Sequence, residues 1–154
     1  MASKADPAAI YPKLREHMMN LRVPGISAGS VHAVLMDWPI PKGMITVLAG
    51  ADGAASIYLS SGGGFIGGGQ KPGVLQDSAK RAVDLATALL PEAAPVESRD
   101  LPPAGTVYFW ITTGESVRRV AAQEDDLKKG KPPASALGAA MQAIITAYRH
   151  RHST

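Results

Sequence analysis

The sequence predicts an α+β fold, a five-stranded antiparallel sheet with three packed helices, in the order α-β-β-β-α-β-β-α. Three segments repeat apolar residues at helical spacing. The other apolar segments are short and are joined in pairs by turns, which favours antiparallel over parallel neighbours. At 154 residues, of which 45% are hydrophobic, we expect a single domain over 1–154, with frayed ends at about 1–6 and 150–154.

Each expected helix carries one apolar stripe. The first begins at Asp6-Pro7, because aspartate caps free amides and proline is tolerated in the first turn, and it ends before Pro24-Gly25. The second spans about Val74 to Leu90, and the third lies near the C-terminus. The stripes are Ile10, Leu14, Met18 and Leu21 in the first helix, Leu75, Ala79, Ala82, Val83, Ala86 and Leu89 or Leu90 in the second, and Leu137, Met141, Ile144, Ile145 and Tyr148 in the third.

The expected strands are apolar or alternating runs bounded by glycine and proline. Asp52-Gly53 between two such runs is typical of a hairpin, because both residues tolerate positive φ. In the clearest strand, Val107, Phe109 and Ile111 face one way while Tyr108 and Trp110 face the other. The proline-rich stretch 92–105 is predicted to be an extended connection. The five strands are Val31–Trp38, Met44–Ala49, Ala54–Ser60, Thr106–Thr113 and Ser116–Ala122.

Composition excludes several kinds of site. The chain has no cysteine, which rules out disulfides, thiolate metal sites and cysteine catalysis. The histidines at 17, 32, 150 and 152 show no metal-ligand spacing, so we expect no metal and no cofactor. The net charge of +3 arises from scattered basic residues, which argues against nucleic acid as a specific partner.

The sequence also argues against a membrane partner. No apolar run approaches the roughly 20 residues that a membrane-spanning helix needs. The amino terminus lacks the apolar core of a signal peptide. We therefore expect a cytoplasmic protein.

The most informative feature is the glycine-rich segment Gly62–Gly69, in which only Phe65 and Ile66 interrupt six glycines. The glycines are Gly62, Gly63, Gly64, Gly67, Gly68 and Gly69. Each glycine adds unfolded-state entropy that folding must overcome, so a run this dense indicates a special structural need.

Three kinds of interpretation of this segment compete: a nucleotide-binding motif, an anion-binding concavity and a close passage of the chain. A dinucleotide fingerprint, G-x-G-x-x-G, lacks the parallel βαβ context that it requires, and a Walker A motif fails because Gln70 stands at the lysine position. An anion-binding concavity of glycine amides with Lys71 nearby stays open. We favour the third interpretation, in which the glycines let the chain pass closely over the sheet or a partner, with Phe65-Ile66 as an apolar plug.

Two further motifs bear on function. Ser27 lies in a G-x-S-x-G match, but the segment follows a helix and precedes a strand, the reverse of a nucleophile elbow, so we expect a loop residue. Asp37 and Trp38 end an apolar strand. Together they predict either a surface ledge that a binding partner recognises or simply the end of the strand. Trp38, Phe65 and Trp110 are candidates for an exposed apolar patch that marks a protein interface.

Two blocks of the chain resemble a family of small, uncharacterised bacterial proteins. In that family a V-L-M-D-W strand, here Val34–Trp38, precedes the pattern D-G-x-A-S-x-Y-x-S-x-G-G-G-x-I-G-G-G, here Asp52–Gly69. A weaker likeness extends to Val107–Ile111, to 124–127 and to the last helix. The resemblance implies a shared architecture and a special role for the glycine-rich segment, and it implies no activity. The expected strand order also resembles roadblock-like and profilin-like adaptor folds, an analogy of fold alone.

These observations favour a non-enzymatic protein-binding or adaptor module over an enzyme. We expect a protein partner or self-association as a homodimer, through the glycine-rich segment and neighbouring aromatic residues. The alternative is a sensor or enzyme that binds an anionic small molecule or nucleotide through the amides of that segment and Lys71. The candidate binding residues are Gly62, Gly63, Gly64, Phe65, Ile66, Gly67, Gly68, Gly69, Lys71, Asp37 and Trp38, and no catalytic residue is predicted.

Overall fold

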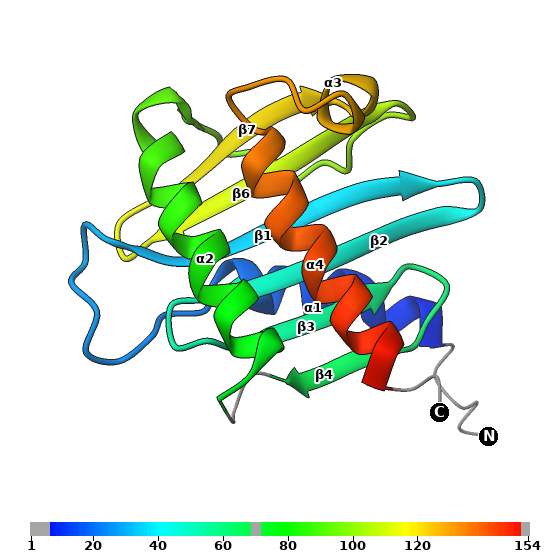
Figure 1. Ribbon diagram of the computed structural model, residues 1–154, viewed down its shortest axis with the longest axis horizontal. Coiled ribbons are helices and arrows are strands. Elements are labelled where there is room, and N and C mark those ends of the chain that lie inside the picture. The colour runs from blue at the N-terminus through cyan, green and yellow to red at the C-terminus, as the bar shows by residue number, and fades with distance from the viewer. Residues whose placement is uncertain (1–6, 69–71, 152–154) are drawn as a thin grey trace.

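The computed structural model describes residues 7–68 and 72–151, which form one antiparallel sheet with helices on both faces (Figure 1). Along the sheet the strands follow the order β4-β3-β2-β1-β6-β7-β5. Sequence neighbours pair through short turns, and β1 at the centre joins the two halves by pairing with both β2 and β6. The strands are β1 (Val31–Ile40), β2 (Gly43–Gly50), β3 (Ala55–Leu59), β4 (Gly64–Gly68), β5 (Ala94–Pro95), β6 (Thr106–Thr113) and β7 (Val117–Gln123).

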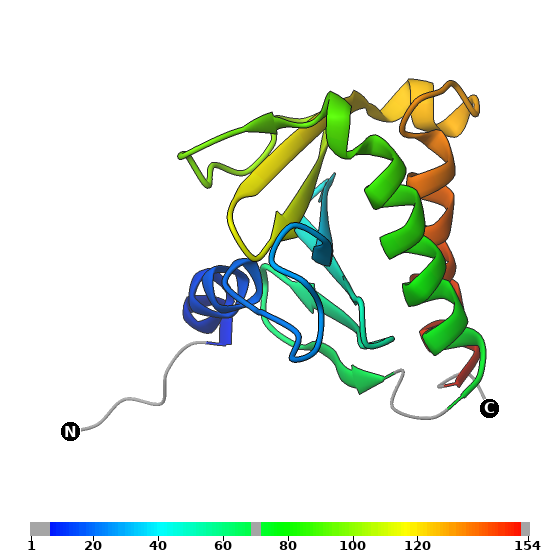
Figure 2. The ribbon, with the colours of Figure 1, turned by 90° about the vertical axis from the view of Figure 1, so that its left-hand side faces the viewer.

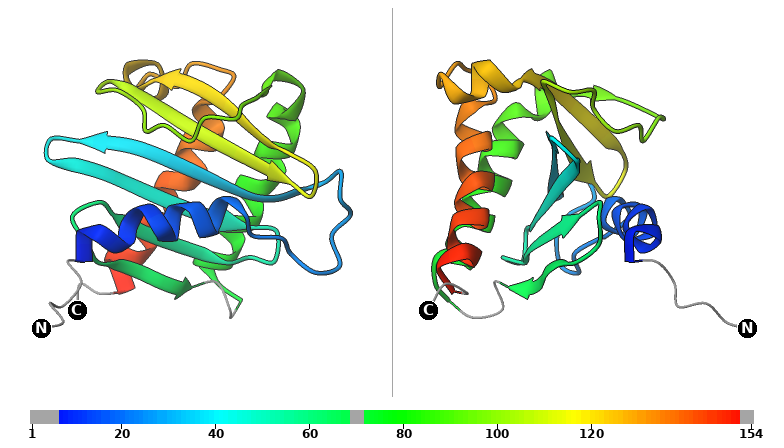
Figure 3. Two further views of the ribbon diagram at one scale, coloured as in Figure 1. Left: turned by 180° about the vertical axis from the view of Figure 1, so that it is seen from behind. Right: turned by 90° about the vertical axis from the view of Figure 1, so that its right-hand side faces the viewer.

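The helices make the molecule three layers deep. Helices α2 (Val74–Leu89) and α4 (Ser135–Arg151) lie side by side over one face of the sheet, while α1 (Pro7–Met19) crosses the opposite face (Figures 2 and 3). A 3₁₀ turn, Leu90–Glu92, ends α2, and the short helix α3 (Glu124–Lys128) follows β7. The sheet therefore buries residues on both faces in its central strands.

Alternation along the strands divides the core into two clusters. In β6, Val107, Phe109 and Ile111 pack toward α2 and α4, whereas Trp110 packs in the smaller cluster beneath α1, which confirms the predicted facing of this strand. The apolar stripe predicted for α2 is also confirmed, because Leu75, Ala79, Ala82, Val83, Ala86 and Leu89 are all buried. The continuous burial of β1 from Val31 to Asp37 follows from cover on both faces.

The prediction of five strands and three helices is wrong, because the sheet has seven strands and the described chain has four α-helices. Within the glycine-rich segment, which belongs to none of the five predicted strands, Gly64–Gly68 forms β4. The stretch 92–105, read as a connection, contains the two-residue strand β5, whose proline is tolerated at a sheet edge. The stretch after β7, to which no element was assigned, begins with α3, because its three acidic residues in the first turn stabilise a helix N-terminus. The analogy with roadblock-like and profilin-like folds depended on the expected order of strands and helices. Because that order is wrong, the analogy does not hold.

The end of one strand and the buried face of one helix also differ from prediction. Strand β1 continues through Pro39 to Ile40, because β6 pairs with it only as far as Asp37 and leaves that side free beyond. Helix α1 is rotated relative to its predicted apolar stripe. Met18 is buried as predicted, but Ile10 is 44% exposed, whereas Arg15 is 7% exposed. The predicted start of this helix at Asp6, like the predicted fraying of 1–6, lies outside the described residues.

Within residues 7–68 and 72–151, no helix has the length and apolar character needed to cross a membrane.

Candidate functional site

The glycine-rich segment starts with a tight turn that leads back along β3. Gly62 and Gly63 have φ angles of +104° and +85°, which non-glycine residues rarely adopt. The Gly62 amide donates to the Leu59 carbonyl at 2.9 Å, and the Leu59 amide donates to the Gly63 carbonyl at 3.1 Å. These first two glycines are therefore required by the turn that joins β3 to β4.

The next glycine lets β4 lie close against β3. Gly64 pairs with Tyr58 and has a φ of +148°, and a Cβ added to it would overlap the Ile57 carbonyl oxygen. Phe65 then pairs with Ile57 in regular register. A side chain at position 64 would both strain the backbone and force the two strands apart.

Because Gly68 has no side chain, Tyr148 of α4 can lie close to the backbone of β3 and β4. A Cβ on Gly68 would overlap the Tyr148 hydroxyl, which donates a 2.5 Å hydrogen bond to the Ala55 carbonyl. The pairing of β3 with β4 is irregular between Ala55 and Ile57, so the tyrosine satisfies a carbonyl at the point where the register shifts. The Tyr148 ring also stacks on Phe65, with centroids 5.2 Å apart. The predicted close passage of the chain over the molecule is thus present, and the group that approaches Gly68 belongs to α4.

The outer edge of β4 is an exposed strand edge. β4 is the last strand at its end of the sheet, and both Gly64 and Phe65 are exposed (Figure 1). Because Gly63 bonds to β3 and backbone groups alternate in direction along an antiparallel strand, Gly64 directs its N–H and C=O away from β3. The strand Gly64–Gly68 carries no charge and no proline. Gly69 and Lys71, the remaining predicted binding residues of this region, lie outside the described residues.

The opposite edge of the sheet is built differently. There β5 is only two residues long and contains Pro95, and it pairs with Arg118 and Arg119 of β7. Short strands, proline and charged residues are the features that discourage pairing with another chain. Among the described residues, these features are therefore present where β5 pairs with β7 and absent from β4.

Asp37 is buried beneath α1, with no exposed surface. Its Oδ2 accepts hydrogen bonds from Arg15 Nε at 3.0 Å, Arg15 Nη2 at 2.6 Å and Trp110 Nε1 at 2.7 Å. Its Oδ1 accepts from Thr46 Oγ1 at 2.6 Å, and this hydroxyl lies 2.5 Å from the Tyr11 hydroxyl. Both carboxylate oxygens thus have hydrogen-bond partners, and the buried carboxylate is out of reach of a substrate.

Arg15 extends this network to the stretch that precedes β6. Its Nη1 donates to the Arg99 carbonyl at 2.6 Å, and its guanidinium lies 5.2 Å from the Trp110 ring centroid. Burial, and then the Asp37 carboxylate, raise the pKa of Tyr11 to about 12. These contacts tie α1, β1, β6 and the stretch before β6 together, so the network has a structural role.

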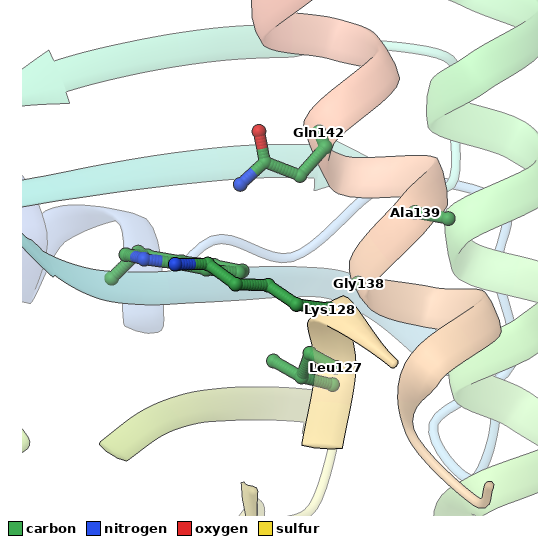
Figure 4. A pocket seen from close by; sticks show the side chains of 6 residues that line it. Leu127, Lys128, Gly138, Ala139 and Gln142 are labelled. Atoms are coloured by element: carbon green, nitrogen blue, oxygen red, sulfur yellow. The ribbon is translucent and has the colours of Figure 1, made fainter. Parts of the chain in front are cut away.

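Trp38 lies on the other face of the sheet from Asp37, as alternation along β1 requires. Its indole Nε1 donates to Glu124 Oε1 at 2.9 Å, and Lys128 Nζ lies 3.2 Å from the same oxygen. The hydrogen bond from Trp38, followed by the effect of Lys128, lowers the pKa of Glu124. The ring borders a small pocket between the end of β1, α3 and α4 (Figure 4).

The structure separates the predicted binding residues into three places. The glycine-rich segment is at one sheet edge, and β2 and β3 lie between it and β1, which carries Asp37 and Trp38 on opposite faces. The predicted patch of Trp38, Phe65 and Trp110 is not formed, because Trp110 is completely buried. Ser27 lies in the loop before β1, as predicted.

The partners of Asp37 and of Trp38 were not predicted from the sequence. A single acid within the apolar run Val31–Trp38 does predict a buried counter-charge, because an unpaired buried carboxylate is costly. It does not identify Arg15, which lies 22 residues away. Likewise Glu124 lies 86 residues from Trp38, and no local pattern links the two.

Comparisons with known proteins give no further guide: no family model, no curated protein and no solved structure matches the chain. The resemblance to small bacterial proteins therefore stays a prediction. Among the described residues no group of three or more histidine, aspartate or glutamate side chains is placed to hold a metal ion.

Proposed function

We propose that this chain is a non-enzymatic protein-binding module that associates by extending its sheet at β4, and that the added strand is β4 of a second copy. The observation that carries the proposal is the asymmetry of the sheet edges. The β5 edge has a proline, minimal length and two arginines on the adjacent strand β7, whereas the β4 edge presents outward Gly64 backbone groups and the exposed, uncharged residues Gly64 and Phe65.

A second copy fits this edge for two reasons. Two β4 strands related by a two-fold axis run antiparallel, as every strand pair in this sheet does. Strands without charge meet their own copies without repulsion, and Phe65, 38% exposed in the single chain, is covered further at such an interface.

The size of the edge sets the strength of association. Two five-residue strands bury less than the roughly 1,200 Å² of a standard interface, so we expect weak, reversible dimers with a dissociation constant of about micromolar or higher. Such a module assembles where its local concentration is high, which suits an adaptor.

The test is sedimentation velocity over a wide range of protein concentrations, on the wild type and three variants. Phe65→Lys adds a charge at the edge and should abolish dimers. Phe65→Leu loses the same stacking on Tyr148 without adding charge, so it should still dimerise. Ala94→Lys places the same charge on the opposite edge strand and should behave as wild type.

Two results contradict the proposal. A wild type that stays monomeric at every concentration shows that this edge does not accept its own copy. Equal association of the wild type and Phe65→Lys shows that any dimer forms elsewhere. Thermal unfolding of each variant establishes that it is folded before association is compared.

The alternative, an anion site formed by the amides of the glycine-rich segment and Lys71, stays a prediction because Gly69 and Lys71 lie outside the described residues. Thermal-shift measurements with nucleotides and phosphorylated metabolites test it directly.

A further inference from the structure

The pocket beside Trp38 is a second feature of the surface, unrelated to the β4 edge. It has a volume of about 290 Å³ and lies between the end of β1, α3 and the first turns of α4 (Figure 4). Small-molecule sites start at about 300 Å³, so this pocket suits a ligand of about one ring. The lining residues are Trp38, Leu127, Lys128, Gly138, Ala139 and Gln142.

One part of the lining is apolar and held in place. The Trp38 indole N–H is already bonded to Glu124 at 2.9 Å, so this side chain offers a ligand only its ring surface. Leu127 borders the same space, and Gly138 contributes no side chain that would fill it. A flat apolar group can therefore pack on the indole with little reorganisation.

The other part of the lining supplies hydrogen-bond donors. Lys128 Nζ has three donors and its ion pair with Glu124, at 3.2 Å, engages one carboxylate oxygen. The Gln142 side-chain amide forms no hydrogen bond within the described part of the chain, and it extends from α4 toward the β1 side of the pocket (Figure 4). Glu124 does not line the pocket, and its Oε1 already accepts from Trp38 and Lys128. Among the polar lining side chains, the Lys128 ammonium and the Gln142 NH₂ offer more donors than the Gln142 carbonyl oxygen offers acceptors, which favours an anionic ligand group over a cationic one.

We propose that this pocket binds a small single-ring carboxylate, with its ring against Trp38 and Leu127 and its carboxylate at Lys128 Nζ and the Gln142 amide. The site is independent of the proposed association through β4, because β2 and β3 separate β1 from that edge. Its exposed cation makes binding weak and salt-dependent.

The probe is benzoate, with benzyl alcohol as its uncharged counterpart, titrated into ¹⁵N-labelled protein. The chain has two tryptophans, so its NMR spectrum contains two indole N–H signals, and Trp38→Phe identifies which belongs to Trp38. We expect benzoate to shift the Trp38 indole signal saturably and to shift the Gln142 side-chain signals. The Trp110 signal should not move, since that ring is completely buried beneath α1.

Two lysine variants test the polar half of the site. Lys128→Ala should weaken benzoate binding about fivefold and leave binding of benzyl alcohol unchanged. Lys129→Ala, at an exposed neighbouring position that does not line the pocket, should bind benzoate as the wild type does. The proposal is overturned if Trp38 shows no saturable shift, if benzyl alcohol binds as well as benzoate, or if both lysine variants weaken binding equally. Retained dispersion of the spectrum establishes that each variant is folded.

Discussion

At the scale of single residues, Asp37 places a negative charge inside a strand that is buried on both faces. Removing a carboxylate from water costs several kcal/mol unless its partners restore the lost hydration. Here Arg15, Trp110 and Thr46 supply four hydrogen bonds within 3.0 Å. Because the partners come from α1, β2 and β6, the charge specifies how α1 sits on the sheet, and a shifted helix would leave Arg15 and Asp37 unpaired.

Tyr11, at the end of this network, gives a prediction about pH. Its pKa in the folded protein is about 12, against about 10 in the unfolded chain, so the unfolded state loses the phenolic proton first as pH rises. The stability from this group is fully present below pH 10 and is lost between about pH 10 and pH 12, up to about 3 kcal/mol at 1.4 kcal/mol per pKa unit.

Urea unfolding at several alkaline pH values, on wild type and Tyr11→Phe, measures this effect. The phenylalanine variant cannot titrate at this position, so its free energy of unfolding should fall less steeply than that of the wild type. Tyr58, whose pKa burial also raises, is present in both proteins and cancels in the difference. If the free energy of unfolding fell equally steeply with pH in the two proteins, the prediction would be contradicted.

At the scale of elements, β4 is a strand that only tertiary contacts explain. Glycine weakens strands in general, so propensity favours a loop for Gly64–Gly68. The strand forms because Gly64 fits against the Ile57 carbonyl and Gly68 admits the hydroxyl of Tyr148. The glycines of this strand are therefore parts of the packing between β3, β4 and α4.

Gly68→Ala tests this account. Gly68 has no positive φ, so alanine is compatible with the backbone, but its Cβ would displace the Tyr148 hydroxyl from the Ala55 carbonyl. We expect a loss of about 1–3 kcal/mol in the free energy of unfolding. Gly29→Ala is the matched control, because a Cβ there has no neighbour within 4 Å, and it should change stability little. Equal effects of the two substitutions would show that the hydrogen bond of Tyr148 does not require a residue without a side chain at position 68.

Which elements could be predicted depends on the range of the interactions that form them. The periodicity of α2 and the alternation of β6 are local, and both were predicted with the correct inward faces. The buried face of α1 was predicted only in part: Met18 is buried, but Arg15 also turns inward to meet Asp37 on another element. The candidate site divides in the same way: the glycine-rich segment stood out in the sequence, whereas the pocket beside Trp38 needs residues from three distant segments.

At the scale of the whole molecule, the difference in composition between the two edges of the sheet determines where a further strand can pair with it. Helices cover both faces of the described sheet, and β5 with its proline pairs with only two residues of β7, Arg118 and Arg119. Of the two terminal strands, β4 is therefore the one without proline or a charged neighbour, and we expect a further strand to be added there. If β4 pairs with a second copy, the outward amide of Gly64 becomes hydrogen-bonded across the interface. The amide of Phe65 faces β3 by the same alternation and is protected already in the single chain.

Amide hydrogen exchange separates these two positions. We expect the Gly64 amide to exchange rapidly in dilute protein and more slowly as the concentration rises, because only the dimer protects it. The Phe65 amide should be slow at both concentrations, which makes it an internal reference for the stability of β4 itself. In Phe65→Lys the concentration dependence at Gly64 should disappear. Slow exchange of Gly64 at every dilution would mean that another part of the same chain covers this edge, and β4 would then not be free to pair with a partner.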